Sequence, residues 1–459
     1  MNFWHPESLR ALLGGTWVSP PARTEVSGVS TDTREIGAGQ AFVALAGERF
    51  DGHAMLADAA HRGSPLAIID NPAAVRDVPE GLGLLRVGDT RRALLRLAEG
   101  YRRTVLDATR VIAVGGSNGK TTTVRLIDAV LGQSLRGSAS VKSFNNSIGV
   151  PLTVLAARPG DQYLVAEVGT NARGEIGPLA SLLMPDIAVV VSIGREHLER
   201  LGSVREVAQE EASLLEPVRP GGAGVVHAEA PHLDEAIAGL ERRPGTIIRF
   251  GAGPGADVRV VGVEATARGQ RFRLNDRSEW EVPLLGRHNA LNAAAAVAVG
   301  RRLGVPEGAI ARGLLGVRGA EMRLQAHEIA GVRVINDAYN ANPDSMRAAL
   351  ATLVEVGAGA RRRVAVLGDM LEMGAHREAV HREIGAVLAQ MREVDVVVLV
   401  GESMQLAGET LDGRARRVAD LEGEGASRVA AMLEPGDVVL LKGSRRMRLE
   451  RVEAALRAR

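Results

Sequence analysis

The stretch RVIAVGGSNGKTTTVRLIDAVLG, residues 110–132, places three glycines and a lysine between an apolar run and a helix-like pattern. The apolar residues up to Val114 predict a buried strand, and the spacing after Lys120 predicts a helix. Glycines at such a junction let backbone N–H groups converge on an anion, and the helix start adds its positive dipole end. Lys120 supplies a full charge, and a hydroxyl of Thr121 or Thr122 can hold Mg²⁺. The stretch therefore predicts a phosphate-binding loop; the alternative is an ordinary glycine-rich turn with Lys120 in solvent.

The loop is shorter than the common P-loop, which has another glycine five positions before Gly119, where this chain has Val114. What remains is the pattern Gly-x-x-Gly-Lys-Thr-Thr, which we expect to cradle a nucleoside triphosphate. The residues expected to surround the phosphates are Gly116, Ser117, Asn118, Gly119, Lys120, Thr121 and Thr122.

Outward from the loop, apolar strand-like runs alternate with helical patterns, which is typical of a mostly parallel sheet covered by helices. Residues 246–283 change to shorter alternating runs, which predict antiparallel strands, and a second alternating block begins near residue 321. We therefore predict an α/β protein of three domains. They are a small α/β domain at 1–87 with a connecting helix at 88–108, a central P-loop-type sheet domain with antiparallel strands appended at 109–319, and a Rossmann-like α/β domain at 320–459.

Composition limits the functional classes. A formal net charge of +1 gives no electrostatic reason to expect nucleic acid or an acidic membrane as partner. The absence of cysteine excludes disulfides, thiolate chemistry and Cys-ligated metal. The first residues lack the basic and apolar regions of a secretion signal, and the apolar runs are too short to span a bilayer. We expect a cytoplasmic protein without membrane insertion, and a monomer.

The shortened loop resembles that of the Mur ligase family, the ATP-dependent amide-forming enzymes of peptidoglycan precursor synthesis. Other motifs follow in the family's order: VSTDTREIGAGQAFVALAGERFDGHAM, FNNSIGVPLTVL, EVGTNARGEIG, REHLERLGS and GRHNALN. Three more, NDAYNANPDSM, VLGDMLEMG and LLKGSRRMRLE, resemble the branch that adds D-alanyl-D-alanine to UDP-N-acetylmuramoyl-tripeptide.

The resemblance implies a ligase of cell wall biogenesis, and hence of cell shape and division, that uses ATP and Mg²⁺. ATP would phosphorylate the terminal carboxylate of the tripeptide, and the amine of D-alanyl-D-alanine would attack the acyl phosphate. ADP and phosphate would leave. The N-terminal domain would hold the uridine nucleotide, and the C-terminal domain would contribute to ATP and D-alanyl-D-alanine binding. Two alternatives stay open: another ligase of the superfamily, of the diamino-acid-adding or folylpolyglutamate type, and a nucleotide-binding relative without ligase activity.

Two residues at strand ends are candidate metal ligands. Glu167 ends the apolar run YLVAE, and α/β sheets place ligands at the carboxyl ends of their strands. The resemblance makes Glu167 a ligand of one Mg²⁺ together with Thr121; the alternative is a charge that only keeps the strand end soluble. His197 follows the run DIAVVVSIG. The resemblance makes it the ligand of a second Mg²⁺, and the alternative is a helix cap.

Glu211 departs from the family. Related ligases have a lysine at this position, fourteen residues after the histidine, and its carbamoylated side chain supplies an oxygen ligand. Glu211 falls on the apolar stripe of its predicted helix with Val207 and Leu214, whereas Glu210 points elsewhere. A carboxylate on a buried face is costly unless it is paired or bound to a cation. We hypothesise that Glu211 supplies that oxygen directly; the alternative is an exposed glutamate after a small register shift.

The resemblance also assigns ATP contacts beyond the loop. His288, Asn289 and Asn292 would meet the adenine, although these residues could simply begin a helix, since Asn is a favoured N-cap. Arg323 would reach the phosphates and Asp337 the ribose. The residues expected to take part in catalysis are Lys120, Glu167, His197 and Arg323.

Candidate substrate contacts complete the set. Ser30, Thr31, Asp32 and Arg34 form a polar turn that resembles the family's uridine-diphosphate contact, with a capping motif as the alternative. Asn145 and Asn146 match residues near the acyl end of the substrate, or are turn residues. Asn340 would meet substrate. Lys442, Ser444 and Arg445 are plausible contacts for the dipeptide carboxylate, and surface charge is the alternative.

Overall fold

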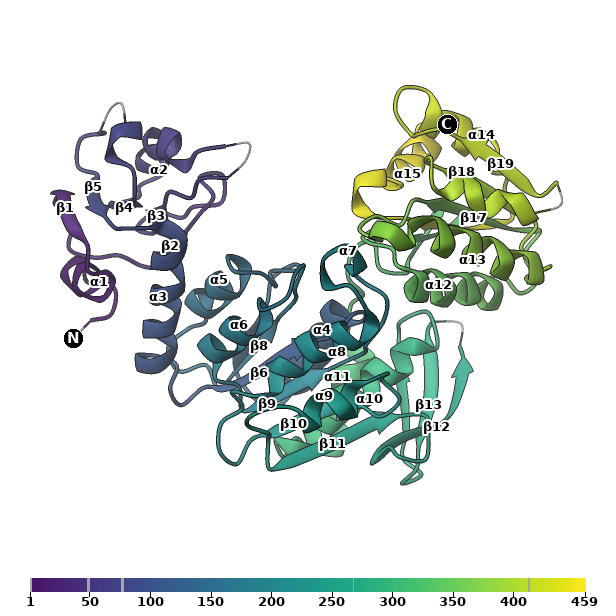
Figure 1. The fold of residues 1–459 in the computed structure, drawn as a ribbon, viewed down its shortest axis with the longest axis horizontal. Helices are drawn as coiled ribbons and strands as arrows, with labels where there is room; N and C mark the ends of the chain where they lie inside the picture. The colour runs from purple at the N-terminus through teal and green to yellow at the C-terminus, as the bar shows by residue number, and fades with distance from the viewer. Residues whose placement is uncertain (1, 48–49, 76–77, 267, 412) are drawn as a thin grey trace. The chain divides into compact units, whose positions relative to one another are not determined.

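The computed structural model describes residues 2–47, 50–75, 78–266, 268–411 and 413–459. Glu48 and Arg49, part of the first motif quoted above, lie outside these residues. Within the described part of the chain, helices and strands alternate along the sequence, and the strands form three sheets of five, nine and six strands (Figure 1). The predicted α/β class is confirmed. No helix in the described ranges has the length and apolar character needed to cross a membrane.

The chain divides into two compact units, and the boundary falls within strand β6. The first unit comprises Met1–Ala113, Leu135–Thr170 and Glu175–Asp186. Its elements are α1 (Pro6–Leu13), β1 (Thr16–Ser19), β2 (Val29–Ser30), β3 (Ala41–Val43), α2 (Leu56–His61), β4 (Leu66–Ile69), β5 (Gly83–Arg86), α3 (Thr90–Thr104), β6 (Arg110–Gly115), β7 (Gly137–Ala139), α5 (Gly149–Ala156), β8 (Tyr163–Glu167) and α6 (Ile176–Leu183).

A five-stranded sheet in the order β1-β5-β4-β3-β2 forms the N-terminal part of this unit. Its pairs are parallel except β1 with β5. Phe42 and Ile69 of the sheet pack with Leu56 of α2 in one core. Helix α3 begins after Asp89, whose side chain accepts a hydrogen bond from the Arg92 N–H as an N-cap does.

Helix α3 lies within residues 88–108, where the sequence predicts a connecting helix. Its apolar residues Leu94, Leu97, Ala98 and Tyr101 are all buried.

The second unit comprises Val114–Ser134, Asn171–Gly174 and Ile187–Arg459. Its elements up to residue 316 are α4 (Lys120–Leu131), β9 (Ile187–Val190), α7 (Leu198–Leu201), α8 (Val204–Ala212), β10 (Ala223–His227), α9 (Leu233–Ala238), β11 (Thr246–Gly251), β12 (Val258–Ala265), β13 (Gln270–Leu274), β14 (Glu279–Val282), α10 (His288–Arg302) and α11 (Glu307–Gly316). Its later elements are β15 (Gln325–Ile329), β16 (Val332–Asp337), α12 (Pro343–Val356), β17 (Arg362–Gly368), α13 (Arg377–Gln390), β18 (Val396–Val400), β19 (Ala415–Val418), α14 (Gly425–Ala431), β20 (Asp437–Lys442) and α15 (Glu450–Arg457).

Strands β9 to β12 pair in parallel, and β12 to β14 pair antiparallel. The prediction of antiparallel strands from residue 246 onward is therefore wrong for β11, which lies between two parallel neighbours. An alternating pattern marks a strand with one exposed face, and it does not fix the direction of the neighbours.

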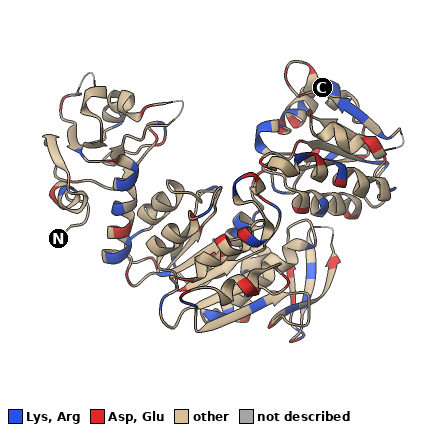
Figure 2. Cartoon of the chain, viewed as in Figure 1, with Lys and Arg blue, Asp and Glu red and all other residues tan. Residues whose placement is uncertain are grey.

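The C-terminal sheet has the order β15-β16-β20-β17-β18-β19, and only β15 is antiparallel to its neighbour. Alternate residues of β17 enter two different cores. Ala365 and Leu367 pack in the core with α12 and α13, and Val364 and Val366 in the core with α14 and α15. Helices thus cover both faces, as predicted for a Rossmann-like domain. Figure 2 shows basic and acidic segments interspersed over the chain, in line with a net charge of +1.

Candidate active site

The glycine-rich turn lies between the end of β6 at Gly115 and the start of α4 at Lys120, as predicted. Gly116 has φ +123° and Gly119, the N-cap of α4, has φ +87°, values that side-chain-bearing residues rarely adopt. A Cβ at Gly119 would lie 2.7 Å from Oδ1 of Asn292. Glycine at this position therefore permits both the turn and the close approach of α10.

The loop after β9 holds the turn in shape. Ser117 N–H donates to the carbonyl oxygen of Ser192 (2.8 Å), and Asn118 N–H donates to the Ser192 hydroxyl (2.8 Å). Gly194 N–H donates in turn to the Ser117 hydroxyl (2.8 Å). These hydrogen bonds fix the turn directly before α4, and the N-terminal end of that helix carries the positive end of its dipole.

Two buried carboxylates flank Lys120. The Lys120 ammonium donates to the carbonyl oxygen of Gly116 and lies 3.8 Å from Oε2 of Glu196. Glu211 is 0% exposed, and its Oε2 accepts a hydrogen bond from Gly116 N–H at 2.6 Å. Burial raises the pKa of Glu211 and of Glu196, and the Lys120 charge opposes that rise.

The predicted burial of Glu211 is confirmed. Glu210 points elsewhere, as predicted, and it is also buried and accepts a hydrogen bond from Gly174 N–H (2.7 Å). Glu196 was not among the predicted residues. The signal that could have found it is its place after β9, at the carboxyl end of a strand that pairs in parallel.

His197 stands at the N-cap of α7, with φ +48°, and its side chain makes no capping hydrogen bond within that helix. Its Nδ1 lies 2.6 Å from Oε2 of Glu372, and its Nε2 lies 3.9 Å from Oε2 of Glu196. The Glu372 carboxylate has a lowered pKa, chiefly because of this contact with His197. The imidazole is therefore oriented by a carboxylate from the C-terminal part of the chain.

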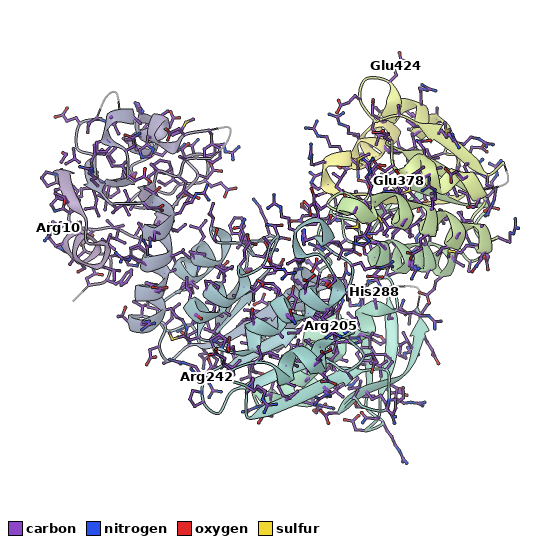
Figure 3. The ribbon with its side chains drawn as sticks, viewed as in Figure 1. Arg10, Arg205, Arg242, His288, Glu378 and Glu424 are labelled. Carbon is purple, nitrogen blue, oxygen red and sulfur yellow. The ribbon has the colours of Figure 1, made fainter. Side chains whose placement is uncertain are left out.

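Helix α10 brings Asn292 to the turn. Asn289 and Asn292 are buried, and Nδ2 of Asn292 donates to Oδ1 of Asn289 (2.8 Å). The helix begins at His288, so these residues do begin a helix, as the alternative held, but the N-cap is Arg287 and not an Asn. Figure 3 marks His288, whose pKa is lowered by burial.

The C-terminal residues predicted to meet the ribose and the dipeptide form one cluster. Nζ of Lys442 donates to Oδ2 of Asp337 (2.6 Å) and to the carbonyl oxygen of Asn340 (3.0 Å). Oδ1 of Asp337 accepts the Leu324 N–H (3.1 Å). The guanidinium of Arg323 lies 4.2 Å from the centre of the Tyr339 ring.

Lys442 is 2% exposed, so its alternative interpretation as a surface charge is wrong. Ser444 is also buried, and its hydroxyl accepts the Leu371 N–H (2.9 Å). Arg445, in contrast, is a half-exposed side chain that pairs with Glu450 (2.6 Å).

The remaining predicted residues belong to the first unit. Glu167 is 1% exposed, and its Oε1 accepts a hydrogen bond from Nδ2 of Asn145 (2.9 Å). Oδ1 of Asn146 accepts the Gly149 N–H (2.9 Å) at the start of α5, which is the turn role. Glu167 is thus presented at the end of β8 with an amide fixed beside it.

In the turn at residues 30–34, the Ser30 hydroxyl donates to the carbonyl oxygen of Asp32 (3.1 Å), and Thr31 lies half-buried between them. The Arg34 guanidinium donates to both Asp32 oxygens (2.6–3.2 Å) and lowers the pKa of Asp32 to about 2. The Arg34 side chain is 85% exposed.

A closed cation cage is absent from the described residues, among which no three His, Cys, Asp or Glu side chains are grouped to hold a metal ion. Mg²⁺ commonly takes only one or two protein carboxylates and completes its shell with phosphate oxygens and water. Buried Oε1 atoms of Glu196 and Glu211 find no hydrogen-bond partner among the described residues. Unpaired buried carboxylate oxygens beside a phosphate-type turn fit a nucleotide-bound cation.

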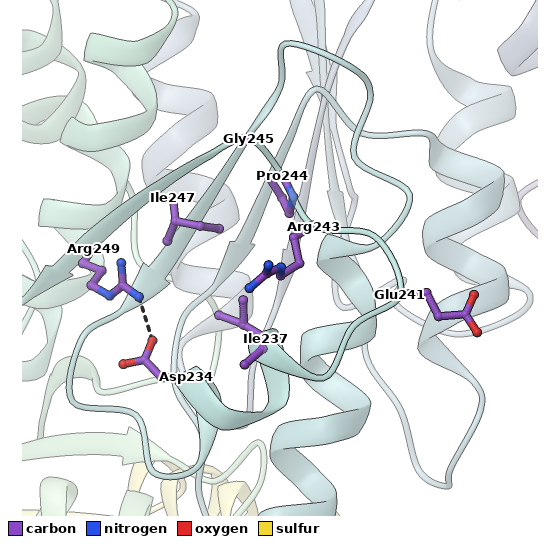
Figure 4. A pocket seen from close by; sticks show the side chains of 9 residues that line it. Asp234, Ile237, Glu241, Arg243, Pro244, Gly245, Ile247 and Arg249 are labelled. Atoms are coloured by element: carbon purple, nitrogen blue, oxygen red, sulfur yellow. Dashed lines mark hydrogen bonds and ion pairs between the residues drawn. The ribbon is translucent and has the colours of Figure 1, made fainter.

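A surface pocket of about 590 Å³ lies apart from these residues, around α9 and β11 (Figure 4). Ile237, Ile247 and Arg243 line it, and Arg249 donates to Asp234 across it (2.8 Å). None of the predicted site residues lines this pocket.

Three family models match the chain. They are the Mur ligase family catalytic domain at residues 25–102, the Mur ligase middle domain at 114–300 and the Mur ligase glutamate ligase domain at 322–445. A Bacillus subtilis (strain 168) protein named UDP-N-acetylmuramoyl-tripeptide–D-alanyl-D-alanine ligase is 36% identical over 454 residues, which cover 97% of this chain and 96% of that protein.

The chain belongs to the Mur ligase family.

An Escherichia coli (strain K12) ligase of the same name is 33% identical over 93% of each chain. A crystal structure of MurF from Acinetobacter baumannii matches the fold with a TM-score of 0.86 at 30% identity, over 99% of each chain. The predicted three-domain Mur ligase architecture is therefore confirmed. The domain boundaries at residues 87, 109 and 320 stay predictions.

Proposed function

We propose that this chain is an ATP-dependent ligase that joins D-alanyl-D-alanine to UDP-N-acetylmuramoyl-tripeptide in peptidoglycan precursor synthesis. The observation that carries the proposal is similarity along almost the whole chain to ligases of that name, 36% identical over 97% of the chain in one case. The glycine-rich turn, with Lys120 at the start of α4, supplies the phosphate-binding feature that such a reaction requires.

The chemistry needs charge neutralisation and alignment more than a protein nucleophile. A carboxylate oxygen of the tripeptide attacks the γ-phosphorus of ATP, and ADP leaves. The amine of D-alanyl-D-alanine then attacks the acyl carbon, phosphate leaves, and the amine loses a proton. Lys120 supplies positive charge at the turn, and we assign Arg323 to the γ-phosphate. The positive dipole end at the start of α4 would help to orient the phosphates.

We assign Mg²⁺ to Thr121, Glu167, His197 and Glu211, with Glu211 supplying the oxygen that carbamoylated lysine supplies in related ligases. The complete burial of Glu211 and its unpaired Oε1 among the described residues support this assignment. When bound, Mg²⁺ would neutralise negative charge on the phosphates of ATP.

We assign each part of the substrates and of ATP to its own set of residues. We assign the uridine diphosphate to the turn at residues 30–34, the adenosine to His288, Asn289, Asn292 and Asp337, and the acyl end of the tripeptide to Asn145 and Asn146. For the dipeptide carboxylate we assign Asn340, Lys442, Ser444 and Arg445. We also propose that the protein acts in the cytoplasm, since the reaction consumes ATP. We propose in addition that it is a monomer.

The direct experiment measures ADP formation by the purified chain with Mg²⁺ and ATP. Turnover that requires both UDP-N-acetylmuramoyl-tripeptide and D-alanyl-D-alanine is expected. Replacing the tripeptide and dipeptide by UDP-N-acetylmuramoyl-dipeptide and a diamino acid, or by folate and glutamate, tests the related ligase types. Turnover with either of those pairs, or none with any pair, would overturn the proposal.

A further inference from the structure

The loop at residues 192–197 links two parts of the second unit. At one end, Ser192 and Gly194 bond to the amide and hydroxyl groups of the phosphate-binding turn, as described above. The next residue, Arg195, instead contacts helices α12 and α13 of the C-terminal sheet domain. A single short segment therefore carries contacts to the turn and to two helices.

Arg195 makes four hydrogen bonds to two carboxylates. Its backbone N–H donates to Oδ2 of Asp344 (2.9 Å), and its Nη2 donates to Oδ1 of the same side chain (2.9 Å). Its guanidinium also donates to both oxygens of Glu383 (2.7 and 3.1 Å). Fork-shaped pairing of this kind is the strong form of a charge-assisted hydrogen bond, and the Arg195 side chain is only 25% exposed.

A second connection runs from the turn itself. Nδ2 of Asn342 donates to Oδ1 of Asn118 (2.9 Å). Asn342 is the N-cap of α12, and its side chain forms a capping box with Ser345, so its position is fixed by the helix. A Cβ at Gly194 would lie 2.7 Å from Oδ2 of Asp344, which shows how closely this loop and α12 approach each other. The turn is thus joined to α12 directly through Asn118, and the loop at residues 192–197 is joined to it through Arg195.

We propose that Arg195 is a positioning residue that couples docking of α12 and α13 to the shape of the phosphate-binding turn. The inference rests on the proposed function, because it gives the C-terminal domain a part in nucleotide binding. Docking fixes Arg195, and with it Ser192 and Gly194 beside Ser117 and Asn118. Coupling of this kind is reciprocal, so bound nucleotide must also favour the docked state.

Arg347 supplies a matched control. It lies within α12, it also pairs with Glu383, and its side chain is 46% exposed. Among the described residues, no hydrogen bond or ion pair joins Arg347 to the loop at residues 192–197. Removing Arg347 disturbs the same carboxylate and leaves the link between loop and helices in place. A difference in ADP affinity between the Arg195 and Arg347 variants therefore measures the contact between the loop and the helices, and not the loss of a positive charge beside Glu383.

The test measures the affinity of the full chain for Mg-ADP by calorimetry in three proteins: the unchanged chain, Arg195→Gln and Arg347→Gln. About tenfold weaker binding is expected for Arg195→Gln and less than twofold for Arg347→Gln. Affinity for UDP-N-acetylmuramoyl-tripeptide, which we assign mainly to the first unit, should change less than twofold in both variants. Equal nucleotide affinities for Arg195→Gln and Arg347→Gln would overturn the inference.

A double-mutant cycle with Glu383→Gln separates positioning from general destabilisation. If Arg195 acts through Glu383, the double variant binds ADP about as weakly as Arg195→Gln alone; fully additive losses contradict the inference. Arg195→Lys keeps the positive charge but loses the paired N–H donors of the guanidinium, so its affinity for ADP should lie between those of Arg195→Gln and the unchanged chain. This variant also serves as the test if Arg195→Gln does not fold. No ADP binding by the unchanged chain would count against the proposed function itself, whereas normal binding with equal variants counts against Arg195 alone.

Discussion

The carboxylate of Glu211 accepts the N–H of Gly116 through Oε2 at 2.6 Å, while Oε1 meets no hydrogen-bond partner among the described residues. Gly116 begins the phosphate-binding turn, so this glutamate is fixed against the backbone that shapes the turn. One oxygen is used to hold the turn, and the other is left for a ligand. This division supports the assignment of Glu211 as a substitute for a carbamoylated lysine.

A substitute of this kind removes the need for carbon dioxide. Rigorous exclusion of carbon dioxide and bicarbonate should change the ligase rate less than twofold, since a carboxylate needs no modification. Glu211→Gln, which keeps the shape but loses the charge, should reduce the rate by about 10²-fold or more, within the range for lost electrostatic groups in active sites. A large rate loss that bicarbonate reverses would instead place a carbamate on another lysine.

The same residue predicts a pH dependence of stability. Burial raises the pKa of Glu211 to about 8 from its ordinary value of 4.5. Below about pH 4.5 the carboxyl is protonated in both folded and unfolded chains and has no effect. As pH rises from 4.5 to 8, only the unfolded chain loses the proton, so the free energy of unfolding falls by up to about 1.4 kcal/mol per pH unit.

Thermal unfolding of the unchanged chain and of Glu211→Gln at pH 5 and pH 8, without divalent cation, measures this contribution. The unchanged chain should lose more stability between the two pH values than Glu211→Gln does. Parallel loss in the two proteins would show that Glu211 keeps an ordinary pKa.

The contact between Nδ1 of His197 and Glu372 predicts a graded series of variants. Carboxylates that hold the far nitrogen of a metal-binding histidine fix its ring, and their loss commonly costs 10- to 100-fold in metal affinity. Glu372→Ala should raise the Mg²⁺ concentration for half-maximal activity about tenfold, and Glu372→Gln, whose amide oxygen can still accept a hydrogen bond, should raise it less. Glu378→Ala, an exposed glutamate of α13, is the control. Equal Mg²⁺ dependence in all three variants would show either that His197 does not bind Mg²⁺ or that Glu372 does not orient it.

Gly119 and Gly304 offer a paired test of the turn. Both have positive φ, +87° and +75°, but a Cβ at Gly119 would lie 2.7 Å from Oδ1 of Asn292, whereas the space at Gly304 is open. Gly304→Ala should therefore cost only the backbone strain, about 1–2 kcal/mol in the free energy of unfolding. Gly119→Ala should cost more and should also weaken ADP binding. If it binds ADP as well as Gly304→Ala does, the close approach of Asn292 is irrelevant to the nucleotide.

Local patterns predicted much of this molecule. An apolar run followed by glycines and a lysine located the turn between β6 and α4, and helical periodicity placed Glu211 on a buried face. Both inferences depend only on neighbours along the chain. The same reasoning did not reveal that Glu210 is buried as well, because its side of α8 is covered by the segment around Gly174, and periodicity cannot show such a contact.

Contacts between distant segments could not be predicted. Arg195 and Asp344 are 149 positions apart, and Arg195 and Glu383 are 188 positions apart. Each looks like an ordinary charged residue in its own segment, and their pairing depends on how the C-terminal helices pack beside the loop after β9. The burial of Lys442 likewise depends on Asp337, which ends a neighbouring parallel strand.

Calorimetric titration of Mg-ADP into the unchanged chain and into Lys120→Ala tests whether the turn around Gly119 binds the phosphates of ATP. Arg125→Ala, a charge removed from the same helix α4, is the control. We expect the unchanged chain and Arg125→Ala to bind Mg-ADP with affinities within about twofold of each other, and Lys120→Ala to bind it at least 100-fold more weakly. Undiminished ADP binding by Lys120→Ala would contradict the binding of phosphates at this turn.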